Sequence, residues 1–297
     1  MRIAVTGGTG FIGAYICRDL RAAGHDLRVM ARARSDTSFV ATLDAEIVTD
    51  DLADPGDLAG FVKGADVVVH DAVDFRACRD DQRANFRTNL LVALDLLELS
   101  RQAGAKQFIF ISTGAVHERI LDDRPLDEAH PLWPGSTYGA YKAAVEAFLP
   151  AYREQFGFNA CAFRPTSVYG LHLTRPAASQ WFGLVRGILR GENFASERGG
   201  KIVHVEDVAQ AVVRAVGRDD VAGEVYELTD CHIYDQTVAE FARQAAGSDA
   251  TIEDLKGSGP RHQIVSDKAR AALRLGLNRG RDGVREYVHE LVRRMAE

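Results

Sequence analysis

The sequence is poor in cysteine, and its cysteines are scattered. It has 297 residues and four cysteines, none of them in a CxxC motif or at the spacing of a zinc-binding Cys/His set. The cysteines are Cys17, Cys78, Cys161 and Cys231. This spacing indicates neither a structural zinc site nor a disulfide framework, and it favours a reducing compartment. We therefore expect no bound metal.

Long basic runs and long apolar runs are also missing. Lys and Arg number 36 against 42 Asp and Glu, which gives a formal net charge of −6 without a basic segment. A protein that attracts nucleic acid electrostatically is therefore not expected. No apolar run approaches the roughly 18 residues of a membrane helix, and a strand predicted from Arg2 onward leaves no room for a signal peptide. We expect a cytoplasmic protein whose partner is a small molecule, with no nucleic-acid or membrane partner.

The most informative stretch is residues 2–13, a short apolar run that breaks into glycines. The run is typical of a buried strand, and the apolar residues after it recur at helical spacing as far as Gly24. In a strand, loop and helix of this kind, the helix N-terminus attracts a diphosphate. Gly7 and Gly10 let the backbone approach its oxygens, and Gly13 lets the helix lie close to the strand. We predict a dinucleotide site here; the alternative is a tight turn whose small residues serve packing only.

Two arginines follow the second predicted strand, which spans residues 27–31. Arg32 and Arg34 stand where an acidic residue would accept hydrogen bonds from the 2′-hydroxyl of NAD, and no acid is present. An Arg at this place can instead bind the 2′-phosphate of NADP. We therefore predict NADP as the cofactor, with NAD as the alternative. The other interpretation of Arg32 and Arg34 is a pair of solvated loop charges.

Apolar runs and helical patterns alternate up to about residue 170. Further strands are predicted over 45–48, 67–69, 108–111 and 158–163. Helices are predicted between them, one beginning at Asp54 and Pro55 and one from Asn85 to Ala103. This alternation predicts an α/β fold with a Rossmann-type, doubly wound parallel sheet and helices on both faces.

After the sixth strand the alternation fades, which predicts a smaller, mostly helical C-terminal lobe for the substrate. We expect a helix over 181–189, a loop over 197–200, a helix opening at His204 and a strand over 225–228. Two or three amphipathic helices then follow Tyr234, with a glycine-rich break at 257–260. The predicted domains are a Rossmann domain over 1–170, rejoined by about 201–230, and a substrate lobe over 171–200 and 231–297.

Three residues form the set to which we assign the chemistry. Tyr138 and Lys142 are four apart and share one helical face, and Thr113 follows the strand over 108–111. A Tyr phenol has a reference pKa of about 10, and a neighbouring ammonium lowers that pKa. Tyr138 would then act as general acid/base during hydride transfer with a nicotinamide, while Thr113 hydrogen-bonds the same substrate oxygen. The alternative is a half-buried aromatic residue beside a solvated Lys.

A series of motifs also matches a known family. The motifs are Thr6 to Gly13, Asp51-Leu52, His70-Asp71-Ala72-Val73, Asn89, Ser112-Thr113-x-x-Val116, Tyr138-Gly-Ala-Tyr-Lys142, Arg164-Pro165-x-x-Val168-Tyr169-Gly170 and His204-Val-Glu-Asp207-Val208-Ala209. In this order they resemble the extended short-chain dehydrogenase/reductases, a group that includes nucleotide-sugar epimerases and dehydratases. The resemblance covers roughly residues 1 to 230, and the C-terminal lobe matches only in outline. Together with Arg32 it implies a set of cofactor-binding residues: Gly7, Gly10, Phe11, Ile12, Arg32, Asp51, Leu52, Ala72, Asn89, Tyr138, Lys142 and Pro165.

Departures from the family's pattern concern the substrate. An Arg that usually reaches the diphosphate of a nucleotide sugar is absent, because Gly199 and Gly200 stand at its place and Arg198 is only a neighbour. Loss of that charge-assisted pair disfavours a UDP- or dTDP-sugar. Asp71 replaces an apolar residue, and His117 replaces the usual Tyr; alternatively, backbone N–H groups satisfy Asp71 and His117 faces solvent. The candidates for substrate contact are Asp71, Asp74, His117, His172 and Arg175.

These observations favour an NAD(P)-dependent oxidoreductase that transfers hydride at a hydroxyl or carbonyl carbon of a sugar-like or other small substrate. A redox-neutral nucleotide-sugar epimerase is the alternative. A dehydratase is less favoured, because Gly114 and Ala115 supply no acidic pair. An alternative of another class is a non-catalytic NAD(P)-sensing regulator, which the retention of Thr113, Tyr138 and Lys142 disfavours. A homodimer is possible.

Overall fold

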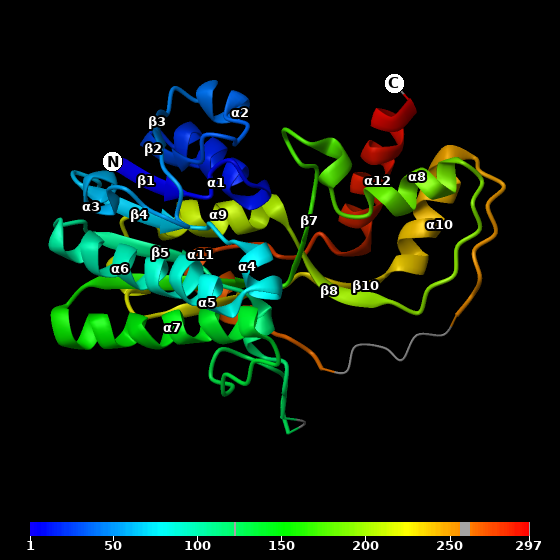
Figure 1. The fold of residues 1–297 in the computed structure, drawn as a ribbon. Helices are drawn as coiled ribbons and strands as arrows, with labels where there is room; N and C mark the ends of the chain where they lie inside the picture. The colour runs from blue at the N-terminus through cyan, green and yellow to red at the C-terminus, as the bar shows by residue number, and fades with distance from the viewer. Residues whose placement is uncertain (122, 256–261, 297) are drawn as a thin grey trace.

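The computed structural model describes residues 1–121, 123–255 and 262–296. Its main body is a seven-stranded sheet of order β3-β2-β1-β4-β5-β6-β9, in which every neighbouring pair is parallel. The strands are β1 (Arg2–Thr6), β2 (Asp26–Ala31), β3 (Glu46–Thr49), β4 (Val67–His70), β5 (Gln107–Ile111), β6 (Asn159–Pro165) and β9 (Val225–Leu228). The strand order reverses between β1 and β4 (Figure 1). In open α/β sheets, ligands bind outside the carboxyl ends of the strands at such a point.

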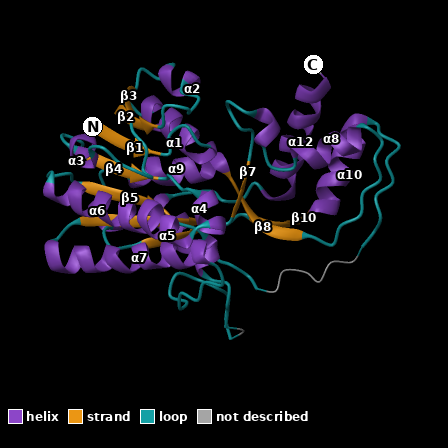
Figure 2. Cartoon of the chain, in the orientation of Figure 1, coloured by secondary structure: helices purple, strands orange, loops and turns teal. Residues whose placement is uncertain are grey.

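Helices cover both faces of this sheet, as Figure 2 shows. One face carries α1 (Phe11–Ala22), α9 (Val205–Ala215) and α11 (Asp267–Leu273), and the other carries α3 (Leu58–Val62), α6 (Val92–Gln102) and α7 (Thr137–Phe156). Successive residues of a strand point to opposite faces, so Ile3 and Val5 enter the first core and Ala4 enters the second. The predicted α/β class and doubly wound Rossmann-type sheet are confirmed.

The helix predicted from Asn85 to Ala103 is not one regular α-helix. It is divided into α5 (Gln82–Asn85), the π-helical segment η1 (Phe86–Leu91) and α6. Periodicity of apolar residues does not reveal a π-helical segment, because one extra residue barely changes the pattern. The other short helices near the main sheet are α2 (Ser38–Ala41), α4 (Phe75–Asp80) and the 3₁₀ turns η2 (Gly114–Val116) and η4 (Asp219–Val221).

A second lobe is built on a small sheet that the sequence did not predict. Its strands are β7 (Ser167–Tyr169), β8 (Gly199–His204) and β10 (Cys231–Tyr234), in the order β10-β8-β7. The helices α8 (Phe182–Leu189), α10 (Asp235–Ala246) and α12 (Gly280–Ala296) pack with it in a separate core, and the 3₁₀ turn η3 (Pro176–Ala178) precedes α8. The loop expected over 197–200 is therefore partly strand. Gly199 is needed there, because a Cβ would lie 2.7 Å from a Tyr234 ring carbon.

The chain crosses repeatedly between the main body and the second lobe. After β10 and α10 it returns to the main sheet, where α11 packs against α9 and β9, and it then leaves again for α12 beside α8 and α10. Arg279 fixes the last crossing through its ion pair with Asp207, at 2.9 Å. The predicted domain boundaries stay a prediction, and the predicted break at 257–260 lies outside the described residues.

Local polar contacts explain two further differences from the sequence prediction. The helix expected from Asp54 begins at Leu58, where Asp57 is the N-cap and accepts the Gly60 N–H at 2.7 Å. Asp50 holds the preceding turn by accepting the Gly56 N–H at 3.1 Å. Strand β6 runs through Pro165 and does not end at Phe163, because it pairs with β9 as far as Leu228. Among the helices of the described segments, none combines the length and the apolar composition required to cross a membrane.

A buried ion network ties α7, β6 and β9 together. The Arg164 guanidinium on β6 contacts Glu146 of α7 at 2.6 Å and Glu227 of β9 at 3.0 Å. All three side chains are almost fully buried. His117 joins the network, with its Nε2 at 3.0 Å from a Glu227 carboxylate oxygen, and Ser112 donates its hydroxyl to Glu146. The network thereby connects the helix that carries Tyr138 and Lys142 to the sheet beneath it.

We predict that Arg164→Met lowers the free energy of unfolding by about 3–5 kcal/mol, because it leaves two buried carboxylates without their cation. Urea denaturation followed by circular dichroism measures this. Arg153→Met is the control, since Arg153 and Glu224 form an exposed pair at 3.7 Å and such pairs are worth roughly 0–1 kcal/mol. Equal losses of unfolding free energy in the two variants would show that the buried network contributes no more to stability than an exposed ion pair.

Candidate active site

The loop between β1 and α1 and the start of the helix have no room for a side chain at Gly7 or Gly13. Gly7 has a φ of +78°, and a Cβ there would lie 2.6 Å from the Ala72 backbone nitrogen. A Cβ on Gly13 would lie 2.2 Å from the Gly7 carbonyl oxygen. Gly10 is the N-cap of α1, and no side chain accepts a hydrogen bond from the N–H groups at this end of the helix as a cap. The first N–H groups of α1 have no acceptor within the helix, so the loop and helix form a cradle that fits a dinucleotide diphosphate.

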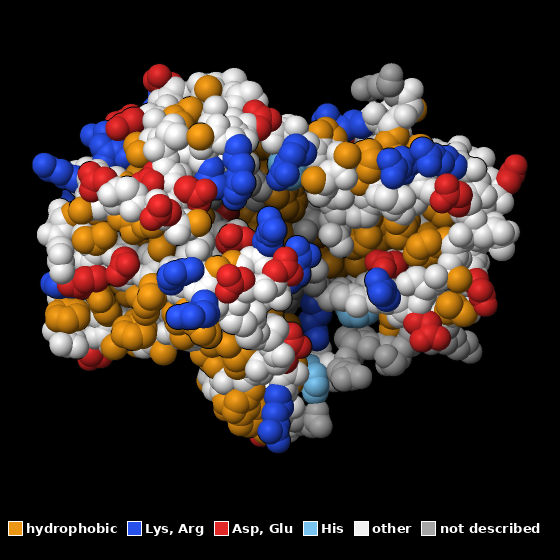
Figure 3. Space-filling model, in the orientation of Figure 1, with side chains coloured by type: hydrophobic (Ala, Val, Ile, Leu, Met, Phe, Trp, Pro, Cys, Tyr) orange, Lys and Arg blue, Asp and Glu red, His pale blue; other side chains and the backbone are white. Residues whose placement is uncertain are grey.

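A cavity of about 690 Å³ begins at this loop and runs past the carboxyl ends of β1, β4, β5 and β6. Figure 3 shows the hollow between the main body and the second lobe. Its walls contain every predicted site residue except His117: Gly7, Gly10, Phe11, Ile12, Arg32, Asp51, Leu52, Asp71, Ala72, Asp74, Asn89, Thr113, Tyr138, Lys142, Pro165, His172 and Arg175. The fold therefore gathers these residues in one place, and their roles stay predictions.

The predicted catalytic residues meet on one wall of the cavity. The Tyr138 phenol on α7 hydrogen-bonds the side chain of Thr113, which follows β5 directly. Lys142 lies one helical turn further on and is 1% exposed. Its ammonium donates to the Ile111 carbonyl and lies 4.4 Å from the centre of the Phe110 ring. Tyr138 and Thr113 thus form a direct pair, with Lys142 held behind them by the end of β5.

Asp71 lies between the start of α1 and Lys142. It follows β4, its N–H donates to the Thr6 carbonyl at 3.2 Å, and its carboxylate accepts a hydrogen bond from the Gly13 N–H. A backbone N–H group thus satisfies part of the hydrogen-bonding capacity of the Asp71 carboxylate, which agrees with the alternative interpretation of Asp71 from the sequence. Burial raises the pKa of Asp71 to about 7, against the opposing effect of the Lys142 ammonium.

The side chains of Asn89 and Asp74 are mainly engaged with the protein itself. The Asn89 amide accepts the Asp74 N–H at 2.8 Å and donates to the Asp74 carbonyl at 3.1 Å. The Asp74 carboxylate caps α4 by accepting the N–H groups of Arg76 and Ala77. Asn89 belongs to η1, and π-helical segments often occur at functional sites. Both residues line the cavity, and their main contacts hold the loop after β4.

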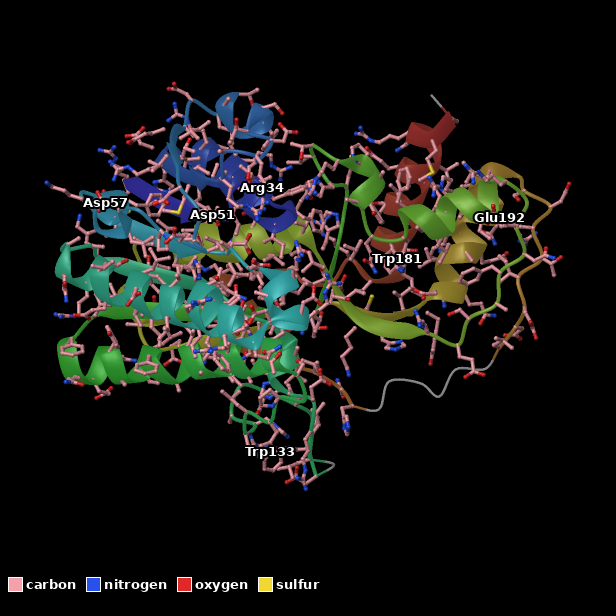
Figure 4. All side chains as sticks on the ribbon, viewed as in Figure 1. Arg34, Asp51, Asp57, Trp133, Trp181 and Glu192 are labelled. Atoms are coloured by element: carbon pink, nitrogen blue, oxygen red, sulfur yellow. The ribbon has the colours of Figure 1, made fainter. Side chains whose placement is uncertain are left out.

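The residues at the far end of the cavity surround a second hollow. Arg32, Arg34 and Asp51 border this hollow of about 300 Å³, beside the ends of β2 and β3. Figure 4 shows Arg34 and Asp51 in this part of the main body, whereas Trp181 lies in the second lobe. Among the residues that the structure describes, no carboxylate pairs with Arg32 or Arg34 within ion-pair distance. Likewise, no group of three or more metal-binding side chains occurs in the described segments.

His117 does not line the cavity and does not face solvent, so the alternative of a solvent-facing residue is wrong, and its contact with substrate stays a prediction. It is 5% exposed and belongs to the network of Arg164 and Glu227. The sequence analysis missed this network altogether. Glu146 lies four residues after Lys142 and therefore on the same helical face, which was the available signal. Its partners come from strands far away in the sequence, so periodicity alone could not identify them.

Comparison with known proteins identifies the family. A family model described as the NAD dependent epimerase/dehydratase family matches residues 3–229. The chain belongs to this family. The match spans the glycine loop, the cavity walls and Tyr138 with Lys142. The protein is thus an enzyme of the extended short-chain dehydrogenase/reductase type.

Curated members of the family that are similar to this chain include both reductases and epimerases. A ketoreductase of Stigmatella aurantiaca, named for a farnesylated dihydroquinoline oxide, is 30% identical over 77% of this chain and 68% of its own length. A ceramide reductase of Caulobacter vibrioides is 32% identical over 82% of this chain and 69% of its own. A UDP-glucose 4-epimerase of Corynebacterium glutamicum is 24% identical over 93% of this chain and 90% of its own length.

Solved structures of family members share the fold across the whole chain. A UDP-glucuronic acid 4-epimerase from Bacillus cereus, in complex with UDP-glucuronic acid and NAD, has a TM-score of 0.82 at 20% identity over 99% of this chain and 100% of its own. A UDP-glucose 4-epimerase from Thermus thermophilus, in complex with NAD, has a TM-score of 0.79 at 25% identity over 98% and 99%. At 20% identity, the likeness to the Bacillus cereus enzyme shows a shared fold and nothing about the reaction.

The electrostatic setting of Tyr138 differs from the sequence-based expectation for this family member. Burial raises the pKa of Tyr138 to about 12, and the hydrogen bond from Thr113 only partly opposes it. Lys142 was expected to lower this pKa, but it is not among the groups that affect Tyr138. Burial lowers the pKa of Lys142 itself to about 8, while Asp71 opposes that shift. The Tyr138 phenol therefore holds its proton more tightly than an exposed Tyr does.

We predict that Asp71→Asn changes how stability depends on pH. The pKa of Asp71 is about 7 in the folded protein and 3.8 as reference. The folded state therefore binds the proton more tightly, and the stability from this group is complete below about pH 4 and is lost as the pH rises through about 7. The variant should gain stability relative to the wild type between pH 5 and pH 8 in urea unfolding. Asp249→Asn, at an exposed position, is the control, and parallel pH curves for Asp71→Asn would contradict the assignment.

Proposed function

We propose that this family member is an NAD(P)-dependent oxidoreductase that transfers hydride at a hydroxyl or carbonyl carbon of a small substrate. The observation that carries the proposal is the Tyr138 and Thr113 pair, backed by Lys142, in the wall of a cavity that starts at the glycine cradle. A bound nicotinamide would supply the hydride-transfer chemistry. The substrate would enter from the side of the second lobe, for which we keep residues 171–200 and 231–297 as the proposed extent.

The roles of the three residues follow from their contacts. A protonated Tyr138 can give its proton to a substrate carbonyl oxygen as the carbonyl carbon gains hydride. Thr113 already hydrogen-bonds this phenol and can bond the same oxygen. Lys142 lies one helical turn from Tyr138 and donates to the Ile111 carbonyl, so its role is to hold α7 against the end of β5.

The charges of the cavity support net redox chemistry over nucleotide-sugar epimerisation. Of the described residues in the cavity wall, the cations are Arg32, Lys142 and Arg175. A nucleotide sugar would bring a second diphosphate, and Gly199 and Gly200 lie in β8 at the place of the Arg that commonly receives it. The redox-neutral epimerase, as in the solved neighbours, stays the second candidate.

NADP is the cofactor that we propose, with NAD as the alternative. Arg32 and Arg34 are exposed at the end of β2, and the second hollow between them and Asp51 has room for a phosphate. Asp51, which stands beside this hollow, follows β3 and is not at the position of a ribose-binding acid at the end of β2. The solved epimerases were crystallised with NAD. The proposed preference of this chain for NADP therefore rests on its own residues and not on these relatives.

We further propose a homodimer and a cytoplasmic location. Large hydrophobic side chains are exposed on η1 and α7, namely Leu91, Phe148 and Phe156 at 51%, 43% and 44%. Figure 3 shows hydrophobic side chains gathered on this side of the main body. A second copy of the chain would cover this face by packing the same helices against it.

Tyr138→Phe is the main test of the function. It keeps the ring and its contact with Phe75 but removes the transferable proton, so kcat should fall by roughly 10²- to 10⁴-fold. Turnover is measured by the absorbance of reduced nicotinamide, with NAD and NADP separately, over simple ketones, free sugars and nucleotide-linked sugars. Tyr152→Phe, on the same helix and outside the cavity wall, is the matched control. Near wild-type turnover of Tyr138→Phe would overturn the assigned role.

Arg32→Ala should reduce the preference for NADP over NAD by about tenfold, because a charge-assisted hydrogen bond to the 2′-phosphate is lost. The ratio of the two dissociation constants, from calorimetric titration, measures this. Arg21→Ala removes a half-buried Arg that lies outside the cavity and serves as control. An unchanged ratio in Arg32→Ala would show that Arg32 does not recognise the phosphate.

A further inference from the structure

A loop of the second lobe lies over the start of α1. Tyr15 of α1 donates its hydroxyl to the Leu171 carbonyl at 2.7 Å. The Phe11 ring stacks on the His172 ring, with 5.7 Å between ring centres and 20° between planes. His172 is 2% exposed, and its backbone N–H donates to the Ser179 hydroxyl at 2.8 Å. The loop is therefore fixed against the first residue of the helix whose N-terminus forms the diphosphate cradle.

The His172 ring leaves two hydrogen-bond donors facing each other. Its Nδ1 lies 3.2 Å from the Arg175 N–H and 3.4 Å from the Thr174 N–H, so Nδ1 is the acceptor. In a neutral imidazole the other nitrogen, Nε2, then carries the proton. This Nε2 lies 3.1 Å from Nη2 of the Arg175 guanidinium, which is also a donor. In this tautomer neither N–H group accepts from the other, and an anionic oxygen beside the pair would bond to both.

Arg175 also lacks a carboxylate partner. Its side chain is exposed, and within the segments that the structure describes it forms no ion pair within 4.0 Å. The Asp36 carboxylate is bonded to the Ser38 N–H and hydroxyl, and Arg175 has only a weaker charge interaction with it. Burial and the Arg175 cation both lower the pKa of His172, which keeps the ring neutral near pH 7. The cation is therefore available to a ligand.

The position of Arg175 identifies the kind of ligand. Arg175 and His172 line the same cavity as Arg32, Ser35 and the glycine loop. The interaction with Asp36 places Arg175 near the segment that follows β2, which is the side of the adenosine half of a dinucleotide. Lys and Arg side chains gather along the hollow between the two lobes (Figure 3). Tyr138 and Thr113 lie further along the sheet, on α7 and at the end of β5.

We propose that His172 and Arg175 bind a phosphate of the adenosine half of the dinucleotide, and do not contact the substrate as the sequence suggested. Arg175 from the second lobe and Arg32 from the main body then hold the cofactor from two sides. Binding of the cofactor thereby fastens the second lobe to the main body. The inference rests on the proposed dinucleotide function, and it assigns one further cofactor residue to it.

The test is calorimetric titration of the full chain and of Arg175→Ala with NADP, NAD, 2′,5′-ADP and ADP. The structure predicts that Arg175→Ala weakens binding by about five- to twentyfold, the loss of one charge-assisted hydrogen bond at an exposed site. A loss with NADP and 2′,5′-ADP alone assigns Arg175 to the 2′-phosphate, and an equal loss with all four ligands assigns it to the diphosphate. Either result supports the proposal.

Two controls separate this inference from the proposed function. Arg190→Ala removes an exposed Arg of the same lobe that does not line the cavity, and it should bind all four ligands like the wild type. Gly10→Val should abolish binding by blocking the cradle. Unchanged affinity in Arg175→Ala, while Gly10→Val still fails to bind, would overturn the inference and leave the function standing. No binding of any dinucleotide by the unaltered chain would instead overturn the function.

Discussion

The close contact between Gly7, Gly13 and Ala72 is the constraint on which the rest of the site depends. A Cβ on Gly7 or Gly13 would collide with backbone, at 2.6 Å and 2.2 Å. Without side chains there, α1 can start directly above β1, and the loop after β4 can pass beside it. That loop carries Asp71 and Asp74, and the same approach brings the helix N-terminus to the edge where β5 delivers Thr113. Backbone packing thus sets the distance between cofactor cradle and catalytic wall.

The catalytic wall is in turn supported from behind by buried charge. Arg164 joins α7 to β6 and β9, and Ser112 beside Thr113 donates to the same Glu146. Buried ion pairs add little net stability compared with apolar packing, but in some proteins they specify one arrangement of their partners. Here the partners are the helix with Tyr138 and the strand end with Thr113. The pair of Tyr138 and Thr113, to which we assign proton transfer, therefore rests on a framework whose geometry is fixed by hydrogen bonds.

The sequence predicted what depends on local pattern. Buried strands such as Val67 to Val69 are continuous apolar runs, and the glycine loop has a fixed spacing, so the sheet, the family and the wall of Thr113, Tyr138 and Lys142 could be inferred. Strand β8 could not, because it begins with two glycines whose partner strand lies thirty residues away. The burial of His117 depends on Glu227, 110 residues further along. The raised pKa of Tyr138 depends on burial, which a helical spacing to Lys142 does not reveal.

The repeated crossing of the chain has a consequence for how this enzyme can change. The second lobe consists of separate stretches, and α11 returns to the main sheet between the last two of its helices, α10 and α12. No single exchange of a continuous gene segment can therefore replace this lobe without also replacing part of the main core. New specificities in such a chain are reached more readily by individual substitutions along the cavity wall than by recombination.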